Sequence, residues 1–284
     1  MYNQILLYLT NMNPYKIEGP ALISFSGGRT SGYMLHNILQ AHNGVLPEDI
    51  YVVFANTGKE APETLDFVND VSEKWDVKIY WLELEICKER PIWRTKIVDY
   101  KSASRNGEPF DMLIKKQPFL PNPSMRFCTS ELKINVMKRF MQSNGHKEWF
   151  NVVGLRYDEP RRVANIRNQT NNKWTSLAPM SDAKHDIKDV VNFWKKQNFD
   201  LNLTGVNGKT PAGNCDLCFL KGMDTTISIL KERPELAEWW IEKEKEVGGT
   251  FRKDRPNYIE ILDISKKTQS LFGDDDQMTC FCHD

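Results

Sequence analysis

Glycine and hydroxyl-bearing residues gather between positions 24 and 31, where their types and spacing suit the binding of an anion. The segment reads Ser-Phe-Ser-Gly-Gly-Arg-Thr-Ser and follows an apolar run at residues 21–23. Two adjacent glycines between a strand and a helix let backbone N–H groups turn toward a ligand, and the helix N-terminus adds partial positive charge. We predict a phosphate, sulfate or pyrophosphate site; a glycine-rich turn without a ligand is the alternative. The predicted anion-binding residues are Ser26, Gly27, Gly28, Arg29, Thr30 and Ser31.

Two further loops with suitable side chains each follow a strand-like run. Residues 57–60 read Thr-Gly-Lys-Glu, and residues 154–162 read Gly-Leu-Arg-Tyr-Asp-Glu-Pro-Arg-Arg. Arginine forks match the oxygens of phosphate and sulfate with two parallel hydrogen bonds. The alternatives are an ordinary strand-to-helix turn for the first of these loops and a solvated charged loop for the second. Taken together with the glycine-rich loop, however, the two loops favour one shared anion site. The residues added to that site are Thr57, Gly58, Glu60, Arg156, Arg161 and Arg162.

The cysteines form a fourth group. Cys128 stands at the start of a helix-like segment, where a helix N-terminus favours the thiolate. Cys215 and Cys218 form a Cys-x-x-Cys pair, which binds one side of a metal site or acts as a redox pair. The chain ends with Cys280 and Cys282, followed by a histidine, and Cys87 stands alone on an apolar background typical of a core residue. Spacing alone does not separate a zinc site from an iron–sulfur cluster.

The elements that must position these groups alternate between strand and helix patterns. Apolar runs at residues 51–55, 77–82 and 150–154 predict buried strands, and helical spacing follows each of the early runs. The alternation predicts an α/β fold, a mostly parallel sheet with helices on both faces, whose ligands lie beyond the carboxyl ends of the strands.

Two parts of the sequence depart from this rhythm. The proline-rich residues 86–127 predict an irregular excursion or lid, and two short helical patterns appear near residues 225–231 and 235–247. We therefore expect a nucleotide-binding α/β domain over residues 1–200 and a small helical region with the cysteine pair and tail over residues 201–284.

Composition narrows the class of protein. The chain has 284 residues, 40% of them hydrophobic and 27% charged, and its formal net charge is zero, so no global field favours nucleic acid or an anionic membrane. No apolar run is long enough for a membrane helix, and the first 20 residues lack the pattern of a secretion signal. We therefore expect a cytoplasmic protein, in which six cysteines argue against disulfides and indicate metal, cluster or thiol chemistry, with incidental thiols as the alternative.

Together these segments resemble the phosphoadenosine phosphosulfate (PAPS) reductase family, within the adenine-nucleotide alpha-hydrolase-like group of PP-loop proteins. Residues 26–31 match its PP-loop, and residues 55–64, 126–133 and 154–161 and the Cys-x-x-Cys pair match further motifs in the same order. The resemblance covers roughly residues 20–222 and implies a nucleotide whose phosphates lie on the PP-loop. Relatives of this kind are common in phage genomes, so a phage-type member is expected.

The resemblance implies a reduction of PAPS or adenylyl sulfate. In the family a thiolate attacks the sulfur, an adenine nucleotide leaves, and a thioredoxin-like partner then releases sulfite. By this resemblance Cys280 is the nucleophile, and Arg156 and Lys133 act with Arg161 and Arg162 on the sulfate and phosphates. A 4Fe–4S cluster, with zinc as the alternative metal, would use Cys128, Cys215, Cys218 and one tail cysteine, Cys282.

Three departures from the family pattern leave the activity open. ATP-splitting PP-loops usually carry Asp where this chain has Thr30, the tail matches the family's Glu-Cys-Gly motif only loosely, and one cysteine stands where cluster-bearing relatives have two. The alternatives are an ATP-dependent sulfurtransferase that modifies a nucleic acid and a non-catalytic nucleotide-binding module with a structural metal. The oligomeric state is open too.

Overall fold

The fold is an α/β sheet with helices on both faces, as the sequence predicts. The computed structural model describes residues 13–169, 173–205 and 210–269. Within these ranges six strands form one sheet in the order β4-β3-β2-β1-β5-β6, in which only β4 runs antiparallel to its neighbour. The strands are β1 (Ala21–Ser24), β2 (Ile50–Ala55), β3 (Ile79–Ile86), β4 (Trp93–Val98), β5 (Trp149–Val153) and β6 (Trp174–Leu177).

The strand register brings three loop starts to one edge of the sheet. Ser24, at the end of β1, pairs with Val53 of β2 on one side and with Val153 of β5 on the other. Since these strands are parallel, the segments that follow them leave the sheet side by side. The chain order reverses between β1 and β5, and ligands of open α/β sheets bind in the crevice at such a switch point.

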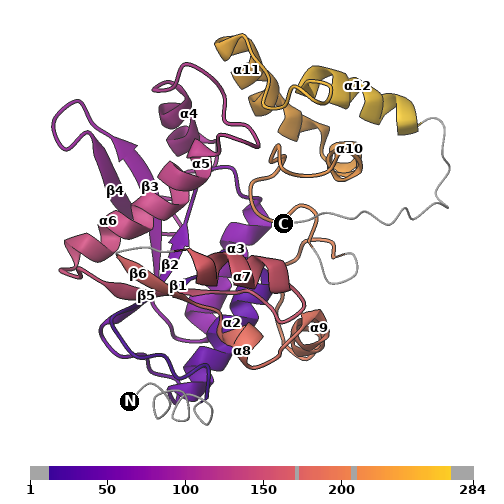
Figure 1. Ribbon diagram of the computed structural model, residues 1–284. Helices are drawn as coiled ribbons and strands as arrows, with labels where there is room; N and C mark the ends of the chain where they lie inside the picture. The colour runs from indigo at the N-terminus through magenta and orange to yellow at the C-terminus, as the bar shows by residue number, and fades with distance from the viewer. Residues whose placement is uncertain (1–12, 170–172, 206–209, 270–284) are drawn as a thin grey trace.

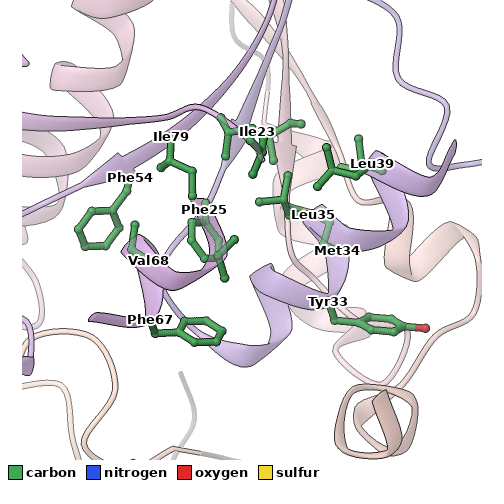
Figure 2. Packing of buried hydrophobic residues seen from close by; sticks show 14 of the residues in the cluster. Ile23, Phe25, Tyr33, Met34, Leu35, Leu39, Phe54, Phe67, Val68 and Ile79 are labelled. Atoms are coloured by element: carbon green, nitrogen blue, oxygen red, sulfur yellow. The ribbon is translucent and has the colours of Figure 1, made fainter. Parts of the chain in front are cut away.

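One face of the sheet is covered by helices α2 (Arg29–Ala41), α3 (Pro62–Lys74) and α9 (Ile187–Trp194). Buried side chains of β1 and β2, such as Ile23 and Phe54, pack against Leu35 of α2 and Phe67 of α3 (Figure 2). The apolar positions of these helices recur at helical spacing, so each presents one face to the sheet.

The other face is covered by α4 (Glu108–Ile114), by a helical segment made of α5 (Phe127–Thr129), a π-helical turn (Ser130–Ile134) and α6 (Asn135–Ser143), and by the C-terminal helices. These last are α10 (Met223–Glu232), α11 (Ala237–Val247) and α12 (Tyr258–Gln269), with a 3-10 turn at Pro234–Leu236 before α11. They gather beside α4, at the top right of Figure 1. Two shorter helices, α7 (Pro160–Asn168) and α8 (Pro179–Asp182), flank β6. Among the described residues, no helix is both long and apolar enough to span a membrane.

The structure corrects the prediction of an irregular excursion at residues 86–127. This stretch contains the edge strand β4 and the helix α4, although its prolines do lie in the turns and near the start of α4. The prediction of two C-terminal helices is confirmed by α10 and α11, while α12 was not predicted. The domain boundary at residue 200 stays a prediction; Leu217 and Trp240, beyond it, share an apolar cluster with Val53 of β2.

Candidate functional site

The glycine-rich loop between β1 and α2 has the backbone geometry that the sequence indicates. Gly27 adopts a left-handed φ of 74°, and Gly28 is the N-cap of α2. The buried Ser31 hydroxyl accepts hydrogen bonds from the N–H groups of Ser26 and Gly28, at 3.2 and 3.3 Å. Ser31 therefore organises the loop from inside, whereas Ser26 is exposed and Gly28, Arg29 and Thr30 are partly exposed.

The side chain of Arg29 is directed away from the expected position of the anion. Its guanidinium forms a bidentate ion pair with Asp200, at 2.7 and 2.8 Å, and also donates to the Thr210 hydroxyl at 3.1 Å. The indole N–H of Trp194 donates to the backbone carbonyl of Arg29 at 2.8 Å. Arg29 thus fastens the chain after α9 onto the start of α2, and the part of it that faces the loop is the backbone.

The arginine-rich loop meets the glycine-rich loop. Gly154 lies so close to α2 that an added Cβ would stand 3.3 Å from the Cα of Ser31. The Arg156 guanidinium donates to the Thr30 hydroxyl at 3.3 Å and forms an ion pair with Asp158 at 2.9 Å. The two predicted loops therefore converge at the switch point between β1 and β5.

Arg161 and Arg162 lie at the start of α7, and both are exposed. The Arg162 guanidinium pairs with Glu159, which also accepts a hydrogen bond from the backbone N–H of Arg156 at 3.0 Å. Of the three predicted arginines, Arg156 is the one that the structure brings into contact with the glycine-rich loop.

The loop after β2 is built around a buried carboxylate. Glu60 accepts hydrogen bonds from the Thr57 backbone N–H and hydroxyl, each at 2.9 Å. Gly58 has a left-handed φ of 78°, and an added Cβ there would lie 3.0 Å from the backbone nitrogen of Gly107. These contacts make Thr57 and Glu60 parts of one rigid turn, held against neighbouring backbone.

The Cys-x-x-Cys segment packs directly on this turn. Cys215 forms an isolated β-bridge with Glu60, and its sulfur lies 3.4 Å from the Thr57 hydroxyl and 3.9 Å from Glu60 Oε1. Lys133 Nζ approaches the same carboxylate oxygen at 4.0 Å. Glu60 thereby connects the turn after β2 with a thiol, Cys215, and a lysine, Lys133, from two distant parts of the chain.

Cys128 and Cys218 complete a group that we call the thiol cluster: Cys128, Cys215, Cys218 and Lys133. Burial raises the pKa of the Cys128 thiol to about 11, with a further contribution from the nearby Cys218. Burial also raises the pKa of Cys215, against the opposing effect of Lys133. Burial alone would lower the pKa of Lys133, but the cysteines and Glu60 around it outweigh this and raise it. The cation is thus placed to stabilise whichever of these sulfurs loses its proton.

Lys133 reaches this position from an unusual helix segment. Residues Ser130–Ile134 form a π-helical turn between α5 and α6, and such turns occur frequently at functional sites. The wider turn begins two residues after Cys128. The prediction that Cys128 stands at the start of a helix is confirmed, but the expectation that this position favours the thiolate is wrong, because burial raises the pKa of the thiol. The π-helical turn carries no signal in the sequence that could have revealed it.

Two sequence predictions on cysteines have different outcomes. Cys87 is not a core residue: it lies half-exposed just past the end of β3, where its thiol donates to Glu85 at 3.5 Å. The apolar run before it was misleading because the sheet ends at Ile86. Cys280 and Cys282 lie outside the described residues, so their predicted roles stay predictions.

Several residues that support the site were not singled out from the sequence. The ammonium group of Lys59 pairs with Asp216 at 2.9 Å, and both side chains are more than 90% buried. Glu83 on β3 accepts from Asn56 at 2.6 Å and from the Ser104 backbone at 2.7 Å, which fixes the end of β2. The hydrogen bonds of Glu83 could have been anticipated from the sequence, because Glu83 is a charged residue within a strand-like apolar run.

Three cysteine sulfurs are a donor set that suits soft metals and iron–sulfur clusters. Electrostatic coupling links Cys218 to both Cys128 and Cys215, and Lys133 would offset part of the negative charge of three thiolates. Within the described ranges no three Cys, His, Asp or Glu side chains already stand at the spacing of a single metal ion. The types of the donors thus suit a thiolate-bound cofactor, whereas their spacing among the described residues does not form a metal site.

Comparison with known proteins assigns the class. Residues 20–203 match the model of the phosphoadenosine phosphosulfate reductase domain. The chain therefore belongs to the phosphoadenosine phosphosulfate reductase domain family, and the predicted resemblance is confirmed.

Two curated relatives are themselves uncharacterized. A nin region protein of Escherichia phage lambda is 31% identical over 210 residues, which cover 70% of this chain and 66% of the phage protein. A protein of Methanocaldococcus jannaschii is 30% identical over 238 residues, which cover 79% of this chain and 41% of the archaeal protein. The matches thus span about two thirds and two fifths of these relatives, and the phage relative agrees with the expectation of a phage-type member.

Two solved structures are similar at low TM-scores. PAPS reductase from Candida auris in a phosphate complex has a TM-score of 0.43 and 11% identity, covering 68% of this chain and 84% of its own. The U34-tRNA thiolase NcsA from Methanococcus maripaludis with its 4Fe–4S cluster has a TM-score of 0.42 and 14% identity, covering 99% and 84%. The strand order given above defines the fold class independently of both.

Proposed function

We propose that this chain is a sulfonucleotide reductase-like enzyme that acts on PAPS or adenylyl sulfate. The observation that carries the proposal is the contact between Arg156 and Thr30, which joins the arginine-rich loop to the glycine-rich loop at the switch point of the sheet. A phosphate on the N-terminus of α2 would meet backbone N–H groups and an arginine together.

In this proposal the glycine-rich loop holds the nucleotide phosphates, and Arg156 binds the sulfate. Arg161 and Arg162, exposed at the start of α7, are available to add contacts. Thr57, Gly58 and Glu60 line the neighbouring loop. Neutralising the anionic substrate in this way lets an anionic nucleophile approach it.

The chemical step consumes two thiols. A thiolate, assigned by family resemblance to Cys280, attacks the sulfur of the sulfonucleotide; an S–S bond forms, the S–O bond to the phosphate breaks, and the nucleotide leaves with the electron pair. A second thiol, from a thioredoxin-like donor, then attacks the enzyme sulfur, forms a disulfide and expels sulfite. Sulfur is reduced from the sulfate to the sulfite level, while the two thiols are oxidised to the disulfide.

We assign the thiol cluster as the place of a metal cofactor. Cys128, Cys215 and Cys218 supply three thiolates, and Cys282 is proposed as the fourth. A bound iron–sulfur cluster would supply redox-capable iron at this place; zinc is the alternative. Lys133 would compensate the charge of the thiolates, and the β-bridge between Glu60 and Cys215 holds the Cys215 backbone in place.

The test is a trapped covalent intermediate. The anaerobically purified protein, reduced and freed of donor thiols, is incubated with PAPS or adenylyl sulfate and analysed by mass spectrometry. A sulfonate adduct on Cys280 in the wild type, lost in Cys280→Ser and retained in Cys87→Ser, supports the proposal. An adduct on Cys282 would reassign the nucleophile, and nucleotide binding without any adduct would reject the reductase. Absorption spectra and metal analysis of the same sample distinguish iron from zinc.

A second candidate is ATP-dependent transfer of sulfur to a nucleic acid. It is favoured by one observation: three thiols surround a lysine next to the turn that follows β2, an arrangement suited to holding reactive sulfur. Thr30, at the position where ATP-splitting PP-loops carry Asp, counts against it. ATP turnover that requires both a sulfur source and tRNA or DNA would support this function. Nucleotide binding with neither reaction would indicate a non-catalytic module.

A further inference from the structure

Both arginines at the glycine-rich loop already hold carboxylates. Arg29 is paired with Asp200, and Arg156 is paired with Asp158. Because the Arg29 side chain is directed away from the expected anion, a phosphate or sulfate that binds here meets Arg156, and it competes with the protein's own carboxylates for that guanidinium.

The Arg156 guanidinium has two carboxylate partners, and it shares one of them, Glu159, with Arg162. Its guanidinium pairs with Asp158 through Nε at 2.9 Å and Nη2 at 3.3 Å, and its Nη1 lies 3.5 Å from Glu159 Oε2. Two carboxylates thus face one guanidinium, at the place where the start of α2 would receive an anion. Since Nη1 also donates to the Thr30 hydroxyl, the guanidinium itself is already aimed at that place.

The two carboxylates are held very differently. The Glu159 side chain is 13% exposed, accepts from the Arg156 backbone N–H and pairs with Arg162. The Asp158 side chain is 37% exposed, and within the described ranges its carboxylate accepts hydrogen bonds from Arg156 alone. Glu159 is therefore part of the loop framework, whereas Asp158 can turn into solvent at little cost.

We propose that Asp158 is an exchangeable counter-ion of Arg156, which a bound anion displaces and which therefore weakens anion binding. The inference rests on the proposed function, in which Arg156 receives the sulfate or phosphate of the substrate. When that group arrives, it replaces Asp158 on the guanidinium, and the carboxylate swings into water. The bound anion takes over the hydrogen bonds that Asp158 accepts from the guanidinium, so the Asp158 charge opposes binding.

The test is isothermal titration calorimetry with AMP and with adenosine 3′,5′-bisphosphate at low salt. Asp158→Asn keeps the size of the side chain and removes its charge. A half-exposed ion pair contributes about 1 kcal/mol, so the variant should bind both probes about fivefold more tightly. The gain should shrink as salt is added, because the competing charges are then screened.

Asp254→Asn is the matched control. Asp254 pairs with Arg252, two residues before it, just as Asp158 pairs with Arg156, but it follows α11 in the C-terminal part of the chain. Asp254→Asn changes the net charge by the same amount as Asp158→Asn, and it should leave the affinity for both probes unchanged. Asp158→Ser should repeat the effect of Asp158→Asn, and thermal unfolding checks that every variant is folded.

The outcomes separate this inference from the proposed function. If the wild type binds the probes and Asp158→Asn binds them equally or less well, Asp158 is a structural partner of Arg156 and the inference is wrong. An equal gain in Asp254→Asn also overturns it, since the effect is then one of overall charge. If neither the wild type nor Asp158→Asn binds either probe, the proposed function itself fails, and the inference fails with it.

Discussion

Replacing Gly27 by alanine should destabilise the protein through the packing of the glycine-rich loop on α3. Gly27 has a left-handed φ of 74°, and an added Cβ would lie 2.7 Å from Thr64 Cγ2 and 3.1 Å from Val68 Cγ2. The backbone conformation costs a non-glycine residue about 1–2 kcal/mol. Forcing a methyl group into a filled space costs about 1–3 kcal/mol more, so we expect a loss of about 3 kcal/mol.

Gly145 provides the matched control. Its φ of 88° is also left-handed, but an added Cβ there would meet nothing within 4 Å. Gly145→Ala should therefore lose only the conformational part, about 1–2 kcal/mol. The difference between the two variants isolates the contact with α3.

The assay is urea unfolding at equilibrium, with AMP affinity as a second readout. Thr64→Ser removes the methyl group that the new Cβ meets, so it should restore part of the stability of Gly27→Ala while costing little by itself. Because the loop must shift to relieve the contact, affinity should fall in Gly27→Ala and stay unchanged in Gly145→Ala. Equal losses of stability in the two glycine variants would refute the reasoning.

The remaining predictions concern three charged or titratable groups. Lys59→Met should lower the free energy of unfolding by about 3–5 kcal/mol, because it leaves the buried Asp216 carboxylate without its ion-pair partner. Adding Asp216→Asn should recover part of this loss. A loss of less than about 1 kcal/mol in Lys59→Met would contradict the burial of the pair. The free energy of unfolding of the metal-free, reduced protein should fall as pH rises from about 8.5 toward about 11, because the Cys128 thiol loses its proton at lower pH in the unfolded chain than in the folded protein. In urea titrations at pH 8 and 10, Cys128→Ala should reduce this pH dependence. An unchanged dependence would contradict the raised pKa of Cys128. Arg29→Met should lower the free energy of unfolding by about 1–2 kcal/mol, because the Arg29 guanidinium holds Asp200. The effect on AMP affinity should be smaller than this. A complete loss of AMP binding in a folded variant would show that the Arg29 side chain reaches the ligand.

The sequence was most informative where local chemistry and position in the sheet agree. The glycine-rich loop and the Arg156 loop could be predicted to meet because each follows a buried apolar run, and parallel strands end at one edge. The edge strand β4 could not: residues Trp93–Val98 show no clean alternation, since Lys96 and Ile97 are both exposed.

Side-chain roles were harder to predict than backbone positions. Arg29 has the right type and place for a phosphate ligand, but its partner Asp200 lies 171 residues away, and no local pattern indicates that pairing. Ser31 likewise has a hydroxyl at the expected site, but this hydroxyl accepts hydrogen bonds from the backbone of the loop itself. Which donors remain for a ligand depends on long-range contacts that only the folded chain reveals.

The turn at Lys59 and Glu60 makes the two ends of the protein interdependent. Both residues are buried, and both find partners, Asp216 and Cys215, beyond the last residue that matches the family model, 203. A fragment cut at that boundary would leave an ammonium group and a carboxylate without the chain that covers them. The residues before and after position 203 should therefore be expressed as one chain if this turn is to fold as described.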